Sequence, residues 1–141
     1  MKKKTLIIGG VAGGATTAAR LRRRDEEMEI IMFERGEYIS YANCGLPYYI
    51  GDTIKSRDVL LLQTPEAMRN KYNVDVRTLN EVIEIVPDQK KVVVKKLKTD
   101  EIYEESYDNL VIATGSSPIK PNISGIDKKI FLHCGMFMIW M

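Results

Sequence analysis

The sequence has few of the residues that build metal clusters or disulfide frameworks. Its 141 residues include two cysteines, Cys44 and Cys134, which lie far apart, and a single histidine, His133. The absence of a CxxC pair excludes a structural zinc site built within this chain, and we expect no metal. So few cysteines favour a cytoplasmic, reducing setting, in which Cys44 is more typically free or catalytic than bridged.

The chain also lacks a strong excess of one charge and long apolar runs. Lysine and arginine number 21 against 19 aspartate and glutamate, and the basic residues are spread along the chain, so no nucleic-acid partner is expected. The N-terminal stretch TLIIGG is too short for the core of a signal peptide. The apolar-rich residues 130–141 are too few to span a bilayer, so we expect no membrane association.

Two apolar stretches near the N-terminus indicate neighbouring parallel strands. Residues 6–8 and 30–33 are apolar without alternation, which is typical of strands covered on both faces. Between them, small residues and then Leu and Arg at helical spacing predict a helix that starts near Gly13. This β-turn-α-β unit predicts an α/β fold of the Rossmann-like, three-layer kind, with a parallel sheet at its centre.

The pattern changes after a short helix predicted over residues 64–72, which Thr64 caps and Pro65 begins. Four stretches then alternate apolar and polar residues and predict a small antiparallel meander. These stretches are residues 74–78, 81–86, 91–98 and 101–107. Residues 109–115, NLVIATG, return to a buried apolar strand, so we expect the meander to lie on the parallel sheet.

The C-terminal part differs in composition from the rest. Residues 115–126, GSSPIKPNISGI, are rich in Pro, Gly and Ser, as linkers between domains are. Residues 130–141 contain no acidic residue, lysine or arginine. We interpret 128–141 as an atypical tail that arises from truncation, a frameshift or a gene fragment, and we assign no catalytic role to His133.

The stretch IIGGVAGG lies where a strand turns into a helix, a position at which backbone N–H groups can hold a pyrophosphate. Gly9 and Gly14 match the first and third glycines of a GxGxxG motif, but Val11 replaces the middle one. Glu34 ends the second strand. Its spacing along the sequence from the glycine turn is close to that of the carboxylate that binds ribose hydroxyls in such motifs. The alternative is a tight turn without a ligand, in which the glycines serve packing only.

Together with this turn, two further motifs identify a family resemblance. With SYANCGLPYYIG at residues 40–51 and YDNLVIATGSSPIKP at residues 107–121, the chain resembles the FAD-dependent pyridine nucleotide-disulfide oxidoreductases. It looks most like their single-cysteine branch of coenzyme A-disulfide and persulfide reductases. The resemblance covers residues 3–127 and implies the N-terminal part of an FAD-binding domain, without the NAD(P)H domain or the domain that forms the homodimer.

The resemblance also implies roles for individual residues. Those that bind FAD would be Gly9, Gly10, Val11, Ala12, Gly13, Gly14, Glu34, Glu81, Val82, Ala113, Thr114 and Gly115. In such an enzyme, electrons pass from NADH or NADPH through FAD to a disulfide formed by the redox cysteine, here Cys44. The implied substrate is coenzyme A disulfide or a persulfide, and the 141-residue chain by itself is expected to be inactive.

The surroundings of Cys44 suit a nucleophile. Residues 44–51, CGLPYYIG, predict a short helix that begins at Cys44, has Pro47 in its first turn and stops at Gly51. Unpaired N–H groups at a helix start stabilise a thiolate. A buried, inert thiol is the alternative, but Asn, Gly and Pro around Cys44 are poor core formers.

A cationic helix face would anchor the substrate. Thr16, Arg20 and Arg23 fall at i, i+4 and i+7 and share one face of the first predicted helix. The substrate-binding residues that we predict are Thr16, Arg20, Arg23, Ser40, Asn43 and Lys71. Alternatively, the arginines of RLRRR form a solvated helix end and offset its dipole.

Two other functions stay open. One is an NADH oxidase or peroxidase, in which Cys44 cycles through sulfenic acid. The other is a non-catalytic fragment that binds a nucleotide or only folds. Oxygen and peroxide need no cationic anchor, so the helix face favours the coenzyme A-type substrate.

Overall fold

The computed structural model describes residues 2–117, 119 and 121–125. Its strands are β1 (Lys4–Ile8), β2 (Glu29–Glu34), β3 (Asp75–Thr78), β4 (Asn80–Val86), β5 (Lys91–Lys96), β6 (Ile102–Ser106) and β7 (Asn109–Ile112). Its α-helices are α1 (Ala12–Arg24), α2 (Leu46–Ile50) and α3 (Pro65–Tyr72). Short 3-10 turns lie at Asn43–Gly45, Arg57–Leu60 and Pro87–Gln89. The predicted tail 128–141, with His133 and Cys134, lies outside the described residues.

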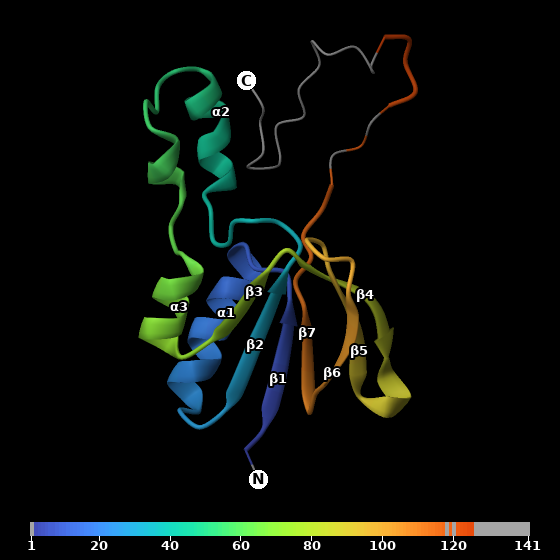
Figure 1. The fold of residues 1–141 in the computed structure, drawn as a ribbon. Helices are drawn as coiled ribbons and strands as arrows, with labels where there is room; N and C mark the ends of the chain where they lie inside the picture. The colour runs from blue at the N-terminus through green and yellow to red at the C-terminus, as the bar shows by residue number, and fades with distance from the viewer. Residues whose placement is uncertain (1, 118, 120, 126–141) are drawn as a thin grey trace.

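A four-stranded parallel sheet forms the middle layer of the molecule (Figure 1). Its strand order is β3-β2-β1-β7, and Leu6 of β1 lies between Ile31 of β2 and Leu110 of β7. Helices α1 and α3 cover one face, and the antiparallel strands β4, β5 and β6 cover the other. This confirms the predicted α/β, three-layer fold. In the described part of the chain no helix is long and apolar enough to cross a membrane.

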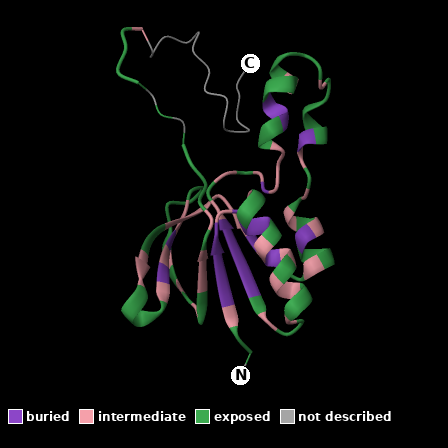
Figure 2. Ribbon diagram, turned by 180° about the vertical axis from the view of Figure 1, so that it is seen from behind, coloured by how far each residue is buried: buried purple, intermediate pink, exposed green. Residues whose placement is uncertain are grey.

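Residues 6–8 of β1 and 30–33 of β2 are apolar and buried (Figure 2), because both faces of these strands are covered. Toward the helices, Ile7 and Met32 join one core with Ala18 of α1. Toward the meander, Leu6 and Phe33 join a second core. Successive side chains of a strand point to opposite faces, so two adjacent cores require the uninterrupted apolar runs from which the strands are predicted.

The prediction that residues 74–78 belong to the antiparallel meander is wrong. This segment forms β3, which pairs in parallel with β2 at the edge of the main sheet, with Val76 opposite Met32. Its alternating pattern has another cause: Val76 faces the helix-side core, whereas the guanidinium of Arg77 lies over the ring of Phe33 on the other face. An edge strand with one polar face has the same periodicity as a meander strand.

The helix predicted after the cysteine loop is confirmed with its cap. The Thr64 hydroxyl accepts a hydrogen bond from the N–H of Ala67 at 3.1 Å, and Pro65 is the first residue of α3. Asn73, in the left-handed region at φ 47°, ends the helix. Both signals are local, so the sequence alone is sufficient to place α3.

Glu105 of β6 links the meander to the parallel sheet. Its side chain, 16% exposed, accepts hydrogen bonds from Lys4 of β1 and from Arg77 of β3, the second at 2.7 Å. Burial by itself raises the pKa of Glu105, but the hydrogen bonds and positive charges of Lys4 and Arg77 outweigh it and hold the pKa below its usual value. Because the folded-state pKa is lowered, the ionised carboxylate stabilises the fold above its ordinary pKa of about 4.3.

We therefore expect Glu105→Gln to lower the free energy of unfolding at pH 7 by about 2 kcal/mol, through the loss of charged hydrogen bonds. The difference from the wild-type chain should shrink as pH falls through the lowered pKa, because the wild-type carboxyl then becomes neutral as well. Urea unfolding between pH 7 and pH 3 measures this. Glu104→Gln is the control, since Glu104 is 57% exposed in its ion pair with Lys91. A difference for Glu105→Gln that stays constant down to pH 3 would contradict the prediction.

Candidate functional site

The turn between β1 and α1 brings three backbone segments into close contact. Gly9 has φ +102°, and a Cβ atom there would lie 2.2 Å from the carbonyl oxygen of Ala113. A Cβ atom at Gly14 would lie 1.7 Å from the carbonyl oxygen of Gly9. Only glycine therefore lets the turn pass the end of β7 and lets α1 pack directly on the turn.

The start of α1 presents N–H groups without a side-chain cap. Val11 is the N-cap residue, and among the described residues no side chain hydrogen-bonds to this end of the helix. The first turn contains no acidic residue either. The first N–H groups of a helix lack partners within the helix and carry its positive dipole end, so this end suits an anion such as a pyrophosphate.

Glu34 is held in place at the end of β2 by two backbone donors. Its Oε2 accepts a hydrogen bond from the N–H of Gly10 at 2.8 Å, and its Oε1 accepts one from the N–H of Gly36 at 2.7 Å. An ionised carboxylate has about four acceptor sites. Two therefore remain for hydroxyl groups of a ligand, and the carboxylate does not have to reorganise to bind them.

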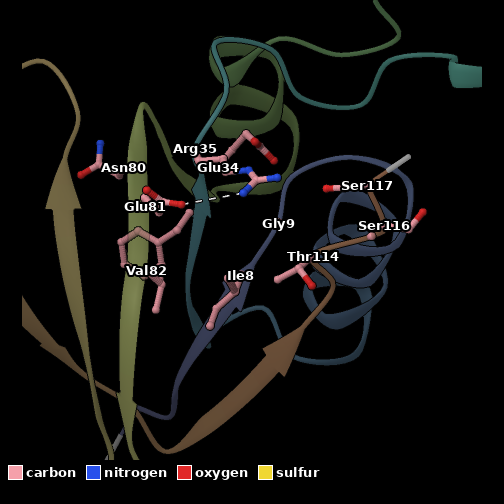
Figure 3. Close-up of a pocket in the computed structure, with 12 residues that line it drawn as sticks. Ile8, Gly9, Glu34, Arg35, Asn80, Glu81, Val82, Thr114, Ser116 and Ser117 are labelled. Carbon is pink, nitrogen blue, oxygen red and sulfur yellow. Dashed lines mark ion pairs between the residues drawn. The ribbon is translucent and has the colours of Figure 1, made fainter. Parts of the chain in front are cut away.

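A pocket of about 280 Å³ lies at the carboxyl ends of the parallel strands (Figure 3). It is lined by Ile8, Gly9, Phe33, Glu34, Arg35, Asn80, Glu81, Val82, Thr114, Gly115, Ser116 and Ser117. This set includes half of the residues predicted to bind FAD: Gly9, Glu34, Glu81, Val82, Thr114 and Gly115. Four separate segments of the chain meet here, at the edge where α/β sheets bind their ligands.

The other predicted FAD-binding residues lie beside the pocket. Gly10, Val11, Ala12, Gly13 and Gly14 form the glycine turn and the first turn of α1. Ala113 contacts this turn, because its backbone N–H donates to Ile8 and its carbonyl is next to Gly9. They are therefore placed to shape the pocket rather than to line it.

Sequence reasoning missed four polar residues of the pocket lining: Arg35, Asn80, Ser116 and Ser117. Three of them have a signal in the sequence, since Arg35 directly follows strand β2 and the two serines follow the Thr-Gly that comes just after β7. Residues just past the carboxyl ends of parallel strands are the expected ligand contacts. Asn80 has no such signal, because it is the first residue of an antiparallel strand.

Cys44 is exposed, but it does not begin a helix as predicted. It lies in the 3-10 turn Asn43–Gly45, and α2 begins only at Leu46, with Pro47 in its first turn and Gly51 as C-cap. The two-residue shift arises because the N–H of Gly45 donates to Ala42, which closes a tighter turn first. Exposure excludes the buried, inert thiol.

The cysteine lies on a lobe that has a small core of its own. Tyr41 and Leu61 form an isolated antiparallel bridge, and the N–H of Ala42 donates to Leu60 at 2.8 Å, so residues 42–60 are joined at their neck. Inside this lobe Leu46 and Leu60 are buried. Cys44 is not one of the described residues that line the 280 Å³ pocket. The site thus has two parts, a pocket and an exposed thiol.

Ser40 connects these two parts through its backbone. Its N–H donates to the carbonyl of Gly10 at 2.9 Å, and its own carbonyl accepts from Leu62 at 2.9 Å. Its φ of 46° lies in the left-handed region, which is uncommon for serine. Ser40 therefore ties the glycine turn to the neck of the cysteine lobe, while Asn43 is exposed next to Cys44.

The predicted substrate residues on α1 share an exposed face. Thr16, Arg20 and Arg23 are all exposed, and α1 begins at Ala12, one residue before the predicted start. Arg22 has a different function, because it donates hydrogen bonds to the carbonyls of Tyr72 and Asn73 at the end of α3. The solvated-helix-end interpretation therefore fails for Arg22.

Those bonds also locate Lys71, another predicted substrate residue. They join the carboxyl-terminal ends of α1 and α3, so Lys71, in the last turn of α3, lies at the same end of the helix pair as Arg23. Lys71 is exposed, with its ammonium 5.4 Å from the ring centroid of Tyr72. Exposed cations of both helices thus lie at the same end of the pair.

Comparison with known proteins agrees with this geometry. A family model described as pyridine nucleotide-disulphide oxidoreductase matches residues 3–135. The chain belongs to this family. Enzymes of the family depend on FAD and on NADH or NADPH.

Individual relatives show which enzymes of the family the chain is similar to. The chain is 44% identical over 119 residues to the coenzyme A disulfide reductase of Staphylococcus epidermidis. The matched stretch covers 84% of this chain and 27% of that protein. It superimposes on the reduced CoADR-RHD of Bacillus anthracis with TM-score 0.86 and 54% identity, covering 89% of this chain and 23% of that one. A NAD-dependent persulfide reductase from A. fulgidus follows with TM-score 0.84 and 38% identity, covering 88% and 23%. The chain thus spans about a quarter of the length of the curated relatives it matches.

The residues present fit the adenosine diphosphate half of FAD. The glycine turn leaves the uncapped start of α1 accessible, Glu34 is oriented with free acceptor sites, and Val82 adds an apolar side chain to the pocket. A volume of about 280 Å³ is slightly below the roughly 300 to 1,000 Å³ of pockets for drug-sized ligands. The described pocket therefore suits the adenine nucleotide part, not the whole cofactor.

Proposed function

We propose that this chain supplies the FAD nucleotide site and the redox cysteine of a reductase that acts on coenzyme A disulfide or a persulfide. The observation that carries the proposal is the pocket, at which four separate segments bring together six residues with predicted FAD-binding roles. When bound, FAD supplies the two-electron carrier between the nicotinamide nucleotide and the disulfide. The chain's own residues bind that cofactor and present the thiol.

Three features in the pocket and beside it would each bind one part of the nucleotide. The first N–H groups of α1 and the glycine turn hold the pyrophosphate. The carboxylate of Glu34, oriented by Gly10 and Gly36, accepts hydrogen bonds from the ribose hydroxyls. Val82 and Ile8 offer the adenine base an apolar wall.

Cys44 acts on the substrate disulfide. Its thiolate attacks one sulfur of coenzyme A disulfide, a new bond forms between that sulfur and Cys44, and the second coenzyme A leaves as a thiolate. With a persulfide, the same attack on one sulfur breaks the bond between the two sulfurs. The other sulfur then leaves as a thiolate or as hydrosulfide. Because Cys44 is exposed on its lobe, a large substrate can reach it.

The exposed face of α1 suits a long anionic substrate. Thr16 and Arg23 are separated by about 10 Å along a helix, at 1.5 Å per residue. Coenzyme A is extended, with its thiol at one end and its phosphates at the other. Its phosphates can therefore pair with Arg20, Arg23 and Lys71 while its sulfur contacts Cys44.

The test is a comparison of two oxidants. We expect coenzyme A disulfide to modify Cys44 in the 141-residue chain, and the double variant Arg20→Ala and Arg23→Ala to slow this reaction roughly tenfold, which corresponds to about 1.4 kcal/mol. The same variant should leave the rate with hydrogen peroxide unchanged. Mass spectrometry of the intact chain measures both rates, and Arg24→Ala, an exposed neighbour on α1, is the control.

The outcome separates the alternatives. Preferential oxidation of Cys44 by peroxide, with no effect of the double variant on the disulfide reaction, would support an oxidase or peroxidase. A Cys44 that reacts with neither oxidant would leave only a nucleotide-binding fragment.

A further inference from the structure

Arg35 carries the single positive charge among the described residues that line the pocket. It follows Glu34 at the end of β2, and Figure 3 shows its guanidinium reaching across the pocket toward Glu81 of β4. Arg35 Nη1 and Glu81 Oε1 are 3.8 Å apart, and the two side chains are 62% and 37% exposed. This ion pair is too long for a hydrogen bond, and such exposed pairs contribute at most about 1 kcal/mol.

The guanidinium can therefore change partner at small cost when a ligand enters. Within the described part of the chain Arg35 makes no hydrogen bond, so movement of its side chain breaks none. Glu81, by contrast, keeps a second cation nearby, because Lys95 is its cross-strand partner in β5. Glu81 therefore keeps a positive charge beside it if Arg35 turns toward a ligand.

The shape and charge of the lining identify what Arg35 would contact. Ile8, Phe33 and Val82 contribute apolar side chains to the lining, which suits a flat base. A guanidinium is planar and stacks on aromatic faces. In the proposed function the phosphates bind at the uncapped start of α1, so the cation across the pocket is not required for them.

We propose that Arg35 closes the pocket over the adenine base of the bound nucleotide. Its guanidinium stacks on the adenine ring, and Glu81 contacts the edge of that ring. The proposal rests on the proposed function, since it requires an adenine nucleotide in this pocket. It makes Arg35 a binding residue that acts on the base, not on the phosphates or the ribose.

Adenosine and ADP distinguish this role from a phosphate contact. We expect Arg35→Ala to raise the dissociation constants of both ligands by the same factor, roughly tenfold. Arg35→Lys should lose most of the same affinity, because an ammonium keeps the charge but lacks the plane. Glu81→Gln should have a smaller effect on both ligands. Titration of the 141-residue chain by NMR or calorimetry gives the constants, and thermal melting checks that each variant is folded.

Each other outcome overturns a defined part of the proposal. If Arg35→Ala weakens ADP but not adenosine, Arg35 contacts phosphate and the stacking role is wrong. If it changes neither constant while the wild-type chain binds both ligands, Arg35 has no binding role and the proposed function stands. If the wild-type chain binds neither ligand, the proposed function fails, and the role of Arg35 fails with it.

Discussion

Replacing Cys44 with serine abolishes the reaction of this chain with coenzyme A disulfide. The attacking group in thiol–disulfide exchange is a thiolate, and a serine hydroxyl is not ionised at neutral pH, so no mixed disulfide can form. The side chain is exposed in the turn Asn43–Gly45, so the substitution removes no buried contact, and we expect the melting temperature to be unchanged. The measurement is the mass of the intact chain after incubation with coenzyme A disulfide.

The second cysteine provides the matched control. Cys134→Ser should keep the full reaction, with the adduct located at Cys44 by peptide mapping. The two single variants together distinguish reaction at the predicted nucleophile from unspecific thiol exchange. An adduct on Cys44→Ser that equals the wild-type adduct would show that Cys134 reacts instead, and would contradict the role given to Cys44.

Gly14→Ala lowers the free energy of unfolding by about 3 kcal/mol, the upper part of the range for overpacking substitutions. The reason is geometric: the new methyl carbon would lie 1.7 Å from the carbonyl oxygen of Gly9, and both atoms belong to the backbone junction of β1 and α1. The helix must move away from the sheet to relieve this contact. Because the glycine turn moves with it, binding of ADP should weaken as well. Urea unfolding and ADP titration measure the two effects.

Gly13→Ala, one position earlier, is the control. Its methyl carbon would meet only the Cβ atom of Ala113, at 3.4 Å, which is an ordinary contact. Alanine also favours the helical backbone by up to about 1 kcal/mol over glycine. Unfolding at an unchanged or slightly higher urea concentration is therefore expected. Equal losses in both variants would mean that close packing of α1 on the turn is not what requires Gly14.

Local patterns were sufficient to predict those elements whose cause is local. Thr64 and Pro65 predict the start of α3 because a side-chain cap and a preset φ act within one turn of helix. The apolar runs of β1 and β2 predict double-sided burial, which the two cores confirm. Alternation in residues 74–78 was misleading, because the period of exposure is the same at the edge of a parallel sheet as in a meander.

Two of the missed features depend on partners that are remote in the chain. Arg22 looks like its neighbours Arg23 and Arg24 in sequence, but only the packing of α1 beside α3 brings the carbonyls of Tyr72 and Asn73 to its guanidinium. The approach of Arg35 to Glu81 likewise requires β4 to lie across the pocket from β2. No local pattern specifies such pairs.

By itself the sequence determined the β-turn-α-β unit, the glycines of its turn, the carboxylate of Glu34 and a thiol in a loop of poor core formers. These follow from residue chemistry and from short-range backbone preferences, which depend on residues that are adjacent in the sequence. Only the tertiary structure decided the order of the strands, the place of β3, the exposure of Cys44 and the meeting of four segments at one pocket. The reason is physical: burial specifies that a face must be covered, whereas the packing of the whole chain selects which segment covers it.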